Sequence, residues 1–440
     1  MNQSSSTTSE GNTLSNLERL KRYLFDYVSS QLTNIPPSSD RKQFVTNLLN
    51  TAYDGTKLNL PLPTKEQLFA DLLDEFLGFD VIQPLLDDTT ISEIMVNGKD
   101  KVFIERKGVV SKTNITFSDD AQILRLINKI IQPLGRRVDV DSPMVDARLP
   151  DGSRVNAIIP PVAIDGPSLT IRKFQKGKLQ INQLIELGSL TRSMADLFRA
   201  CVVSKLNIII SGGTGSGKTT LLNALSSFIP ENERIVTIED AAEIVLQQDH
   251  VVRLETKPAD ANGHGEVTVR ELVRNSLRMR PDRIVVGEVR GGEAMDMLQA
   301  LNTGHDGSLT TLHANSPRDS LSRLETMCLM SGLEIPLKVV RQQIASAIDL
   351  VIQISRERDG SRKIVSVTEV VGMEAETVVL TDIFKYERTG VTSEGKVIGE
   401  MKPTGIRPQF SVRLEANGFK LGPGIFGGTA EGMLNTRHRR

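Results

Sequence analysis

The chain has 440 residues, which is enough for two or three domains that each bury a core of their own. It carries 53 Lys and Arg against 54 Asp and Glu, contains no tryptophan, and only 4% of its residues are aromatic. Proteins that hold nucleic acid are ordinarily basic and offer rings for base stacking, so the composition argues against a dedicated nucleic-acid binder.

The cysteines and the apolar runs indicate a protein of a reducing compartment. Cys201 and Cys328 lie far apart in apolar, helical patterns, which predicts buried free thiols rather than a disulfide. No stretch approaches the roughly 18 apolar residues that span a membrane. The first residues carry neither a basic nor an apolar signal region. We therefore expect a cytoplasmic protein whose contact with any membrane goes through a partner.

The first eighty residues predict a tail followed by a helical bundle. Residues 1–12 are rich in Ser, Thr, Asn and Gly, which predicts a disordered tail. Apolar residues then recur at three- and four-residue spacing from Leu14, and two similar patterns begin at Asp40 and Thr64. We predict a three-helix bundle over residues 13–80 whose helices bury one another's apolar stripes.

The next ninety residues predict an α+β domain over residues 81–173. A helix is expected from Ser118, and the Asn97-Gly98 pair predicts a hairpin. Strands are expected at 91–96, 102–105, 145–149, 154–159 and 168–174. Residues 174–180, which contain a Lys-Gly-Lys sequence, are the predicted linker.

The remaining chain alternates strand and helix patterns, which predicts a parallel sheet and the α/β class. The apolar runs 206–210, 235–238 and 284–286 are typical of strands buried on both faces. Helices are expected to begin near Thr219, Thr268, Gly291 and Ser316. This α/β domain is predicted over residues 181–420, with short strands and Gly-containing turns in its last hundred residues. Residues 421–440 are predicted to form a Gly-rich basic tail.

Directly after the first buried strand, the sequence GGTGSGKT at 212–219 fits the P-loop pattern without a mismatch. Its glycines allow a tight turn whose N–H groups form an anion nest, and the following helix points its positive end at the phosphates. Lys218 adds a charge to the β- and γ-phosphate oxygens, and the Thr219 hydroxyl can ligate Mg²⁺. The predicted ATP-binding residues are Gly212, Gly213, Thr214, Gly215, Ser216, Gly217, Lys218, Thr219 and Thr220, with Thr219 as the metal ligand.

Acidic residues follow the other two buried strands. Glu239, with Asp240 and Glu243 close behind, follows the second strand, and Glu288 follows the third. Ligands bind at this edge of a parallel sheet, and ATP hydrolysis needs a carboxylate that orients water. Acidic residues also decorate solvated strand ends, but two such ends beside a P-loop favour a catalytic role. Gly287 stands where a Walker B motif usually has Asp.

Three arginines of the α+β domain form a second candidate group. Arg148 and Arg154 flank a tight turn, so they should lie close on paired strands, and Arg172 lies on the next strand. Guanidinium groups held close together favour an anion between them. We interpret the three arginines as arginine fingers for the γ-phosphate, the alternative being surface ion pairs with Asp146 and Asp151.

Four stretches occur in an order that resembles the type II/type IV secretion ATPase superfamily. Residues 212–219, 235–243, 287–290 (GEVR) and 304–315 (GHDGSLTTLHAN) are similar to its Walker A, Asp box, Walker B and His box. The stretch 146–154 (DARLPDGSR), with 382–384 and 404–408, looks like the Flp/tight-adherence pilus assembly ATPases (CpaF/TadA-like). The paired cysteines of the type II zinc motif are absent from the sequence.

The resemblance, which covers about residues 81–420, implies a RecA-like P-loop NTPase core preceded by a PAS-like domain. It implies a homohexamer in which ATP lies between the α+β domain and the core. Glu239 would be the general base and Glu288 the partner of water or Mg²⁺, two roles that the sequence does not separate. His313, with His305 nearby, would position the γ-phosphate. The implied partner is a polytopic inner-membrane platform protein of a pilus or secretion system, with no stable nucleic acid.

Three other functions share parts of this pattern. A RecA-like nucleic-acid motor has the same core, but the near-neutral charge speaks against it. A nucleotide-gated scaffold without catalysis is disfavoured because the lysine, carboxylates and histidine are all retained. A pilus retraction motor uses the same chemistry as an assembly motor, so the sequence leaves both directions of work open.

Overall fold

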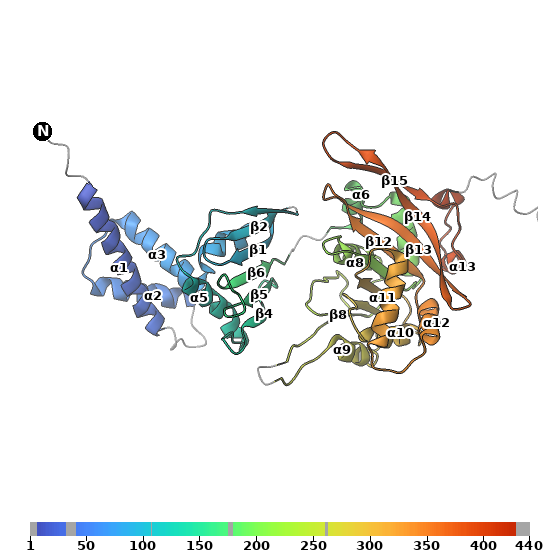
Figure 1. The fold of residues 1–440 in the computed structure, drawn as a ribbon, viewed down its shortest axis with the longest axis horizontal. Helices are drawn as coiled ribbons and strands as arrows, with labels where there is room; N and C mark the ends of the chain where they lie inside the picture. The colour runs from blue at the N-terminus through green and yellow to red at the C-terminus, as the bar shows by residue number, and fades with distance from the viewer. Residues whose placement is uncertain (1–6, 32–40, 107, 175–178, 260–262, 428–440) are drawn as a thin grey trace, which may run out of the picture. The chain divides into compact units, whose positions relative to one another are not determined.

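The structure, a computed structural model, describes residues 7–31, 41–106, 108–174, 179–259 and 263–427. The chain divides into two compact units, Met1–Gln175 and Lys176–Arg440. Figure 1 shows a helical part and a small sheet in the first unit, and a large sheet with helices in the second. The boundary between the units falls inside the predicted linker 174–180, of which residues 175–178 lie outside the described residues.

The first unit begins with three helices, α1 (Thr7–Gln31), α2 (Arg41–Gly55) and α3 (Leu62–Leu77). Their apolar stripes pack into one core that includes Leu20, Leu24, Val28, Val45, Leu49, Leu68, Leu72 and Phe76. Because α1 begins at Thr7, the disordered tail expected through residue 12 is wrong for residues 7–12. Once a helix is nucleated, each added residue gains a backbone hydrogen bond, so a helix can continue past its apolar stripe. Residues 1–6 and the helix start expected at Asp40 lie outside the described residues.

A six-stranded antiparallel sheet follows, in the order β3-β2-β1-β6-β5-β4. Helix α4 (Gln83–Asp87) precedes it, and α5 (Asp120–Ile131) buries Ile123 and Ile127 in its core. The strands are β1 (Ile91–Asn97), β2 (Val102–Arg106), β3 (Val109–Lys112), β4 (Met144–Arg148), β5 (Arg154–Ile158) and β6 (Ser168–Arg172). The five predicted strands are confirmed to within two residues. The sequence missed β3, whose four residues are all exposed and therefore do not alternate.

The second unit is built on a nine-stranded sheet in the order β15-β14-β13-β12-β7-β11-β10-β8-β9. The strands from β12 to β9 in that order run parallel, and β13 to β15 extend the sheet as an antiparallel meander. The parallel strands are β7 (Ile208–Gly212), β8 (Ile235–Glu239), β9 (Val251–Glu255), β10 (Arg283–Val286), β11 (Leu309–Leu312) and β12 (Leu350–Arg356). The meander is β13 (Arg362–Glu374), β14 (Thr377–Val391) and β15 (Val397–Pro403). The predicted α/β class is confirmed.

Helices cover both faces of this sheet, so its central strands are buried on both sides. Ile208 and Ile210 of β7 pack into the core of α7 and α8, whereas Ile209 between them packs into the core of α9 to α12. This double burial explains why the strand is a continuous apolar run. The helices are α6 (Ile181–Glu186), α7 (Arg192–Val203), α8 (Lys218–Ser226), α9 (Val269–Ser276), α10 (Glu293–Leu301), α11 (Pro317–Leu329), α12 (Leu337–Ala347) and α13 (Ser411–Ala416).

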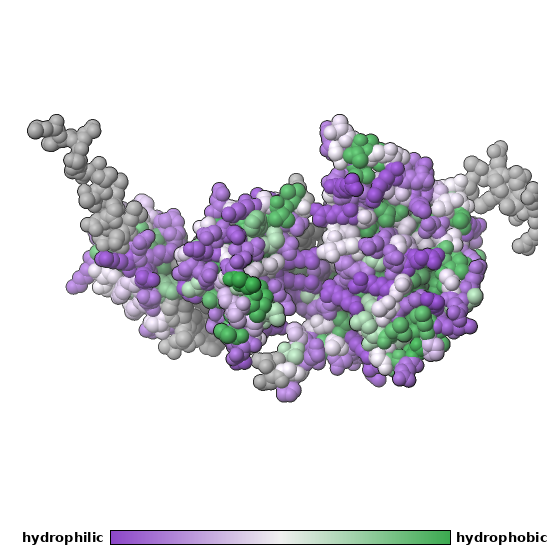
Figure 2. All heavy atoms as spheres, viewed as in Figure 1, coloured by the Kyte–Doolittle hydropathy of each residue, from purple (hydrophilic) through white to green (hydrophobic). Residues whose placement is uncertain are grey.

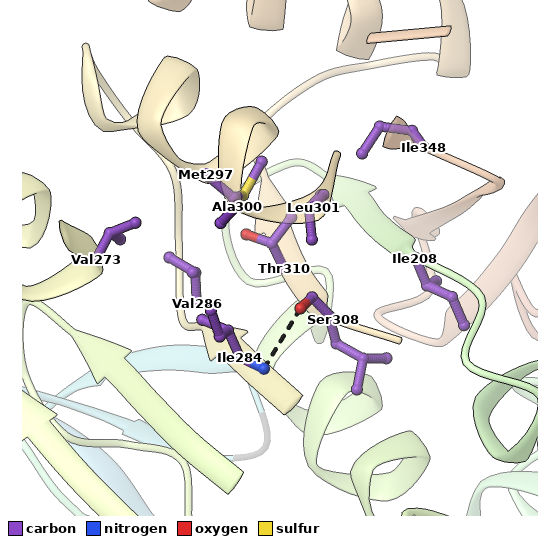
Figure 3. A pocket seen from close by; sticks show the side chains of 11 residues that line it. Ile208, Val273, Ile284, Val286, Met297, Ala300, Leu301, Ser308, Thr310 and Ile348 are labelled. Atoms are coloured by element: carbon purple, nitrogen blue, oxygen red, sulfur yellow. Dashed lines mark hydrogen bonds between the residues drawn. The ribbon is translucent and has the colours of Figure 1, made fainter. Parts of the chain in front are cut away.

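A small cavity of about 10 Å³ lies between α10 and the sheet. Figure 3 shows apolar side chains around it, among them Val286, Met297 and Ile348, and the hydrogen bond from the Ile284 N–H to the Ser308 hydroxyl. It is about large enough for one water molecule, and its lining is apolar. We interpret this cavity as a packing gap, because it is too small and too apolar to be a nucleotide site.

The C-terminal region differs from the prediction in two ways. The expectation of short strands is confirmed for β12 and β15, which have seven residues each, and is wrong for β13 and β14, which have 13 and 15. Gly372 and Gly390 lie at register shifts inside these strands rather than in turns, and a bulge is a usual place for a strand glycine. The tail expected from residue 421 is also wrong for residues 421–427, since Phe426 is 4% exposed and joins the core of α7 and α8. Residues 428–440 lie outside the described residues.

Candidate active site

The P-loop leaves the end of β7 and enters α8, as the sequence predicted. Gly215 and Gly217 have φ angles of +69° and +98°, which glycine adopts without the strain a side chain would cause. A Cβ on Gly212 would lie 2.3 Å from the carbonyl oxygen of Ile354 on the neighbouring strand. The spacing of glycines in this loop is therefore set by backbone geometry and by the close approach of β12.

Lys218 is buried at the start of α8 and crosses the P-loop. Its Nζ donates hydrogen bonds to the carbonyl oxygens of Gly212 and Gly213, both at 3.1 Å. The same atom lies 3.1 Å from Nε2 of His313. The ammonium group of the predicted nucleotide-binding lysine is thus held beside the loop and in contact with the predicted phosphate-positioning histidine.

Two further predicted residues meet at the neighbouring strand ends. His313 follows β11 and Glu288 follows β10, and the structure places Nε2 of His313 2.9 Å from Oε1 of Glu288. Burial and the charge of Lys218 lower the pKa of His313, against the opposing effect of Glu288. The histidine is therefore neutral at pH 7, so it can form a hydrogen bond without adding charge to the site.

Glu288 is also held through its other carboxylate oxygen by Arg290, a residue for which no role was predicted from the sequence. Arg290 donates from Nη2 to Glu288 at 2.6 Å and from Nη1 to Asp240 at 3.1 Å. The hydrogen bond to Glu288 is the main reason that the pKa of Arg290 is raised. The sequence could have indicated this contact, because Arg290 lies two residues after Glu288 and alternate residues of an extended segment lie on one side.

Glu239 has a different environment at the end of β8. It is 4% exposed, and its Oε2 accepts hydrogen bonds from the N–H groups of Glu243 and Ile244 at 2.7 and 2.8 Å. Within the described part of the chain, no hydrogen-bond donor reaches its buried Oε1. Burial raises the pKa of Glu239 to about 7, even though both N–H groups favour the charged form. A carboxyl group with a raised pKa and one unused acceptor is suited to bind a water molecule and take its proton.

Gly287, the departure from the usual Walker B sequence, makes room for Glu239. A Cβ at Gly287 would lie 2.9 Å from Cγ of Glu239, closer than side-chain carbons ordinarily approach. The Gly287 carbonyl also accepts a hydrogen bond of 2.6 Å from the Thr311 hydroxyl. The space of the missing aspartate is therefore occupied by the glutamate of the neighbouring strand.

The residues present fit a magnesium ion that is completed by phosphate oxygens. Thr219 is the second residue of α8, and its carbonyl oxygen is held by the Asn223 side chain at 3.0 Å. Throughout the described ranges, no group of three or more His, Cys, Asp or Glu is arranged to hold a metal by itself. Mg²⁺ usually keeps waters and takes only one or two protein ligands beside the substrate phosphates, which this donor set can provide.

The predicted arginines lie in one row across the sheet of the first unit. Arg148 is the register partner of Arg154, and Arg154 is the partner of Arg172, so the predicted pairing is confirmed. Asp146 accepts a hydrogen bond from Asn156 and Asp151 accepts one from Ser153, and Glu93 on β1 is the register partner of Arg172. Like charges directly opposite each other destabilise a sheet, so the row needs opposite charge nearby.

Comparison with known proteins gives consistent similarities. A family model described as "Type II/IV secretion system protein" matches residues 75–392. A putative conjugal transfer protein of Mycobacterium tuberculosis is 37% identical over 302 residues, covering 67% of this chain and 85% of that protein. The conjugal transfer protein TrbB of Rhizobium radiobacter is 36% identical over 308 residues, covering 69% and 89%. Among solved structures, the VirB11 ATPase of the Brucella suis type IV secretion system, in complex with sulphate, is 30% identical, with a TM-score of 0.36 and coverage of 65% and 94%.

Proposed function

This chain belongs to the type II/IV secretion system protein family and is an ATP hydrolase, and from that premise we propose that it is a hexameric motor for pilus assembly of the Flp/tight-adherence type. The observation that carries the site assignment is the convergence of Lys218, His313 and Glu288. These residues come from three separate segments and are linked by contacts of 3.1 and 2.9 Å.

Each residue has a distinct role in the proposed reaction. The N–H groups of residues 215–220 and the Lys218 ammonium hold the β- and γ-phosphates of ATP. A magnesium ion at Thr219 would neutralise charge on those phosphates. Glu239 takes the proton of the attacking water, and Glu288 orients that water while His313 holds Glu288 in place. The raised pKa of Glu239 is the reason for choosing it as the base.

The arginine row would supply further positive charge to the γ-phosphate from the N-terminal unit of a neighbouring chain. An arginine finger stabilises the negative charge that develops on the phosphoryl group in the transition state. Three guanidinium groups on paired strands could supply positive charge for this purpose. This role is compatible with a ring of six identical chains, in which the row of one chain would face the γ-phosphate that another chain holds.

The two labels for the domains are proposals as well. The parallel strands around β7, with helices on both faces, support a RecA-like core over residues 181–427. The antiparallel sheet with α5 on it supports a PAS-like domain over residues 81–173, preceded by the helical bundle.

The proposed partner is a polytopic platform protein of the inner membrane, contacted from the cytoplasmic side. In the described ranges, no helix has the length and apolar character needed to cross a bilayer. Figure 2 shows apolar side chains gathered on the visible face of the second unit. The exposed apolar residues of α11, α12 and their connection include Leu329, Met330, Leu333, Leu337 and Val339. Such a group supports a protein contact surface.

A motor for type IV secretion or conjugal transfer is the second candidate, since two of the relatives are named for conjugal transfer. A pilus retraction motor would use the same residues. Cells that carry the Lys218→Ala chain distinguish these functions. Loss of surface pili with normal transfer of a conjugative plasmid supports pilus assembly, whereas loss of transfer with normal pili supports the second candidate. Persistent pili that no longer shorten would support retraction.

Steady-state ATP turnover tests the enzymatic assignment. Lys218→Ala should lower kcat by at least about 100-fold, because the lysine charge stabilises the transferred phosphoryl group. Lys205→Ala is the matched control, since this lysine pairs with Glu233 at the opposite end of the sheet. Equal turnover in the Lys218→Ala and wild-type proteins would contradict the assignment.

A further inference from the structure

The turn between β12 and β13 brings two arginines to the outer side of the P-loop. Arg356 ends β12 and Arg362 begins β13, and the two residues are direct register partners. A Cβ on Gly215 would lie 3.6 Å from Nη1 of Arg356, and one on Gly217 would lie 3.1 Å from Cδ of Arg362. The P-loop is therefore covered at its two left-handed glycines by this hairpin, a segment that the sequence analysis did not connect with nucleotide binding.

Arg362 makes the closer and more directional contact. Its Nε donates a hydrogen bond of 3.0 Å to the carbonyl oxygen of Gly215. In a trans peptide the C=O and the following N–H point in opposite directions. A guanidinium that holds the Gly215 carbonyl therefore also fixes the orientation of the Ser216 N–H among the loop amides that form an anion nest. This N–H donates a hydrogen bond of 3.4 Å to the Gly213 carbonyl. A charged donor on the carbonyl also polarises the peptide, which strengthens that N–H as a donor.

The hairpin that carries Arg362 is fixed by the neighbouring strands of the meander. Glu357, which is buried in the turn, accepts a hydrogen bond of 2.9 Å from Arg388 on β14. Asp359 accepts one of 2.8 Å from the N–H of Val397 at the start of β15. The hairpin that carries the Arg362 guanidinium is thus held in place by β14 and β15. The orientation of the Gly215–Ser216 peptide therefore depends on the antiparallel extension of the sheet.

We propose that Arg362 is a positioning residue for nucleotide binding, which acts through the Gly215–Ser216 peptide and does not touch the phosphates. It sets how well the P-loop amides are preorganised for the phosphates, and it does no chemistry. The proposal rests on the ATP hydrolase assignment and adds to it a residue outside the P-loop, the Asp box, the Walker B stretch and the His box.

Affinity and turnover together test this role, with a fluorescent ATP analogue for equilibrium binding and steady-state hydrolysis for kcat and KM. Arg362→Ala should weaken binding of ATP and of ADP by about tenfold, the factor that one hydrogen bond corresponds to, because the loop loses its preorganisation. Its kcat should stay within about twofold of wild type, since the residue makes no contact specific to the transition state. Arg362→Lys, which keeps a charged donor on a long side chain, should recover most of the affinity.

Arg358→Ala is the matched control, because Arg358 lies exposed in the turn of the same hairpin. It should bind nucleotide as the wild type does. Unchanged affinity in Arg362→Ala would overturn the proposal, and so would an equal loss in Arg358→Ala or a fall in kcat with unchanged affinity. If Arg362→Ala melts at a lower temperature, Arg362→Lys decides the question, since weak binding by a stable Lys variant also contradicts the role. A wild-type protein that neither binds nor hydrolyses ATP would instead refute the hydrolase assignment itself.

Discussion

Among single residues, the two strand-end glutamates show how the environment separates chemically identical groups. The sequence left open which one is the base. Glu288 contacts His313 and is hydrogen-bonded by Arg290, and both contacts hold its side chain in position. Glu239 is 4% exposed, and burial raises its pKa to about 7. This difference supports our proposal that Glu239 takes the proton and Glu288 orients the water. No sequence pattern could reveal it, because both residues simply follow apolar strands.

The pH dependence of hydrolysis tests that assignment. A base must be deprotonated, so kcat/KM should rise with pH through an apparent pKa near 7, the value to which burial raises Glu239. The same group should make folding less favourable as pH rises from about 4.5 to about 7, because only the unfolded chain ionises readily in that window. Glu239→Gln should abolish turnover, while Glu243→Gln in the same segment should keep it. An acid limb centred near 4.5 would contradict the assignment.

Gly287→Ala tests the steric account of the altered Walker B stretch. The added Cβ would lie 2.9 Å from Cγ of Glu239, so the glutamate must move from its two N–H donors. Overpacking of this kind costs about 1–3 kcal/mol of unfolding free energy. We expect a lower urea midpoint together with reduced kcat. The control is Gly390→Ala, where nothing lies within 4 Å of the added atom. Wild-type stability and turnover in Gly287→Ala would refute the account.

For secondary-structure elements, the sequence correctly predicted the strands and helix starts that depend on a local pattern of residues. Buried parallel strands appear in the sequence as continuous apolar runs. The N-cap residue Thr268 indicates the start of the helix at Val269. The prediction failed where glycine, which occurs both in turns and at β-bulges, was taken to indicate a turn. Gly372 and Gly390 suggested turns but lie at bulges in long strands. The contact between Arg362 and the P-loop joins residues 147 positions apart, so no local pattern could indicate it.

The segment after residue 420 provides a test at this scale. It was expected to be a tail, yet Phe426 is 4% exposed in the core beside α7 and α8. Phe426→Ala should lower the unfolding free energy by about 3–5 kcal/mol, since it removes a buried ring. Val412→Ala, at a position that is 73% exposed, should change it by less than about 0.5 kcal/mol. Urea unfolding followed by circular dichroism measures both, and equal midpoints would show that the segment does not stabilise the fold.

For the whole molecule, the proposed ring and the proposed role of the arginine row predict that activity needs residues from two chains. Arg154→Ala should lower kcat by about 1000-fold, as loss of an arginine finger does. If the row serves a neighbouring chain, mixing Arg154→Ala with Lys218→Ala chains should restore turnover, because some sites then combine an intact P-loop with an intact row. Glu93→Ala, which changes the register partner of Arg172, is the control at the edge of the row. Mixed rings that stay inactive would exclude action between chains.

The central claim is that the P-loop holds a triphosphate where Glu239, Glu288 and His313 direct water at it. A structure determined with Mg²⁺ and a non-hydrolysable ATP analogue tests this claim most directly. The Lys218 ammonium, which now donates to the carbonyl oxygens of Gly212 and Gly213, should move to the β- and γ-phosphate oxygens, with the metal at the Thr219 hydroxyl. A saturating analogue bound elsewhere, with Lys218 still on those two carbonyls, would contradict the claim.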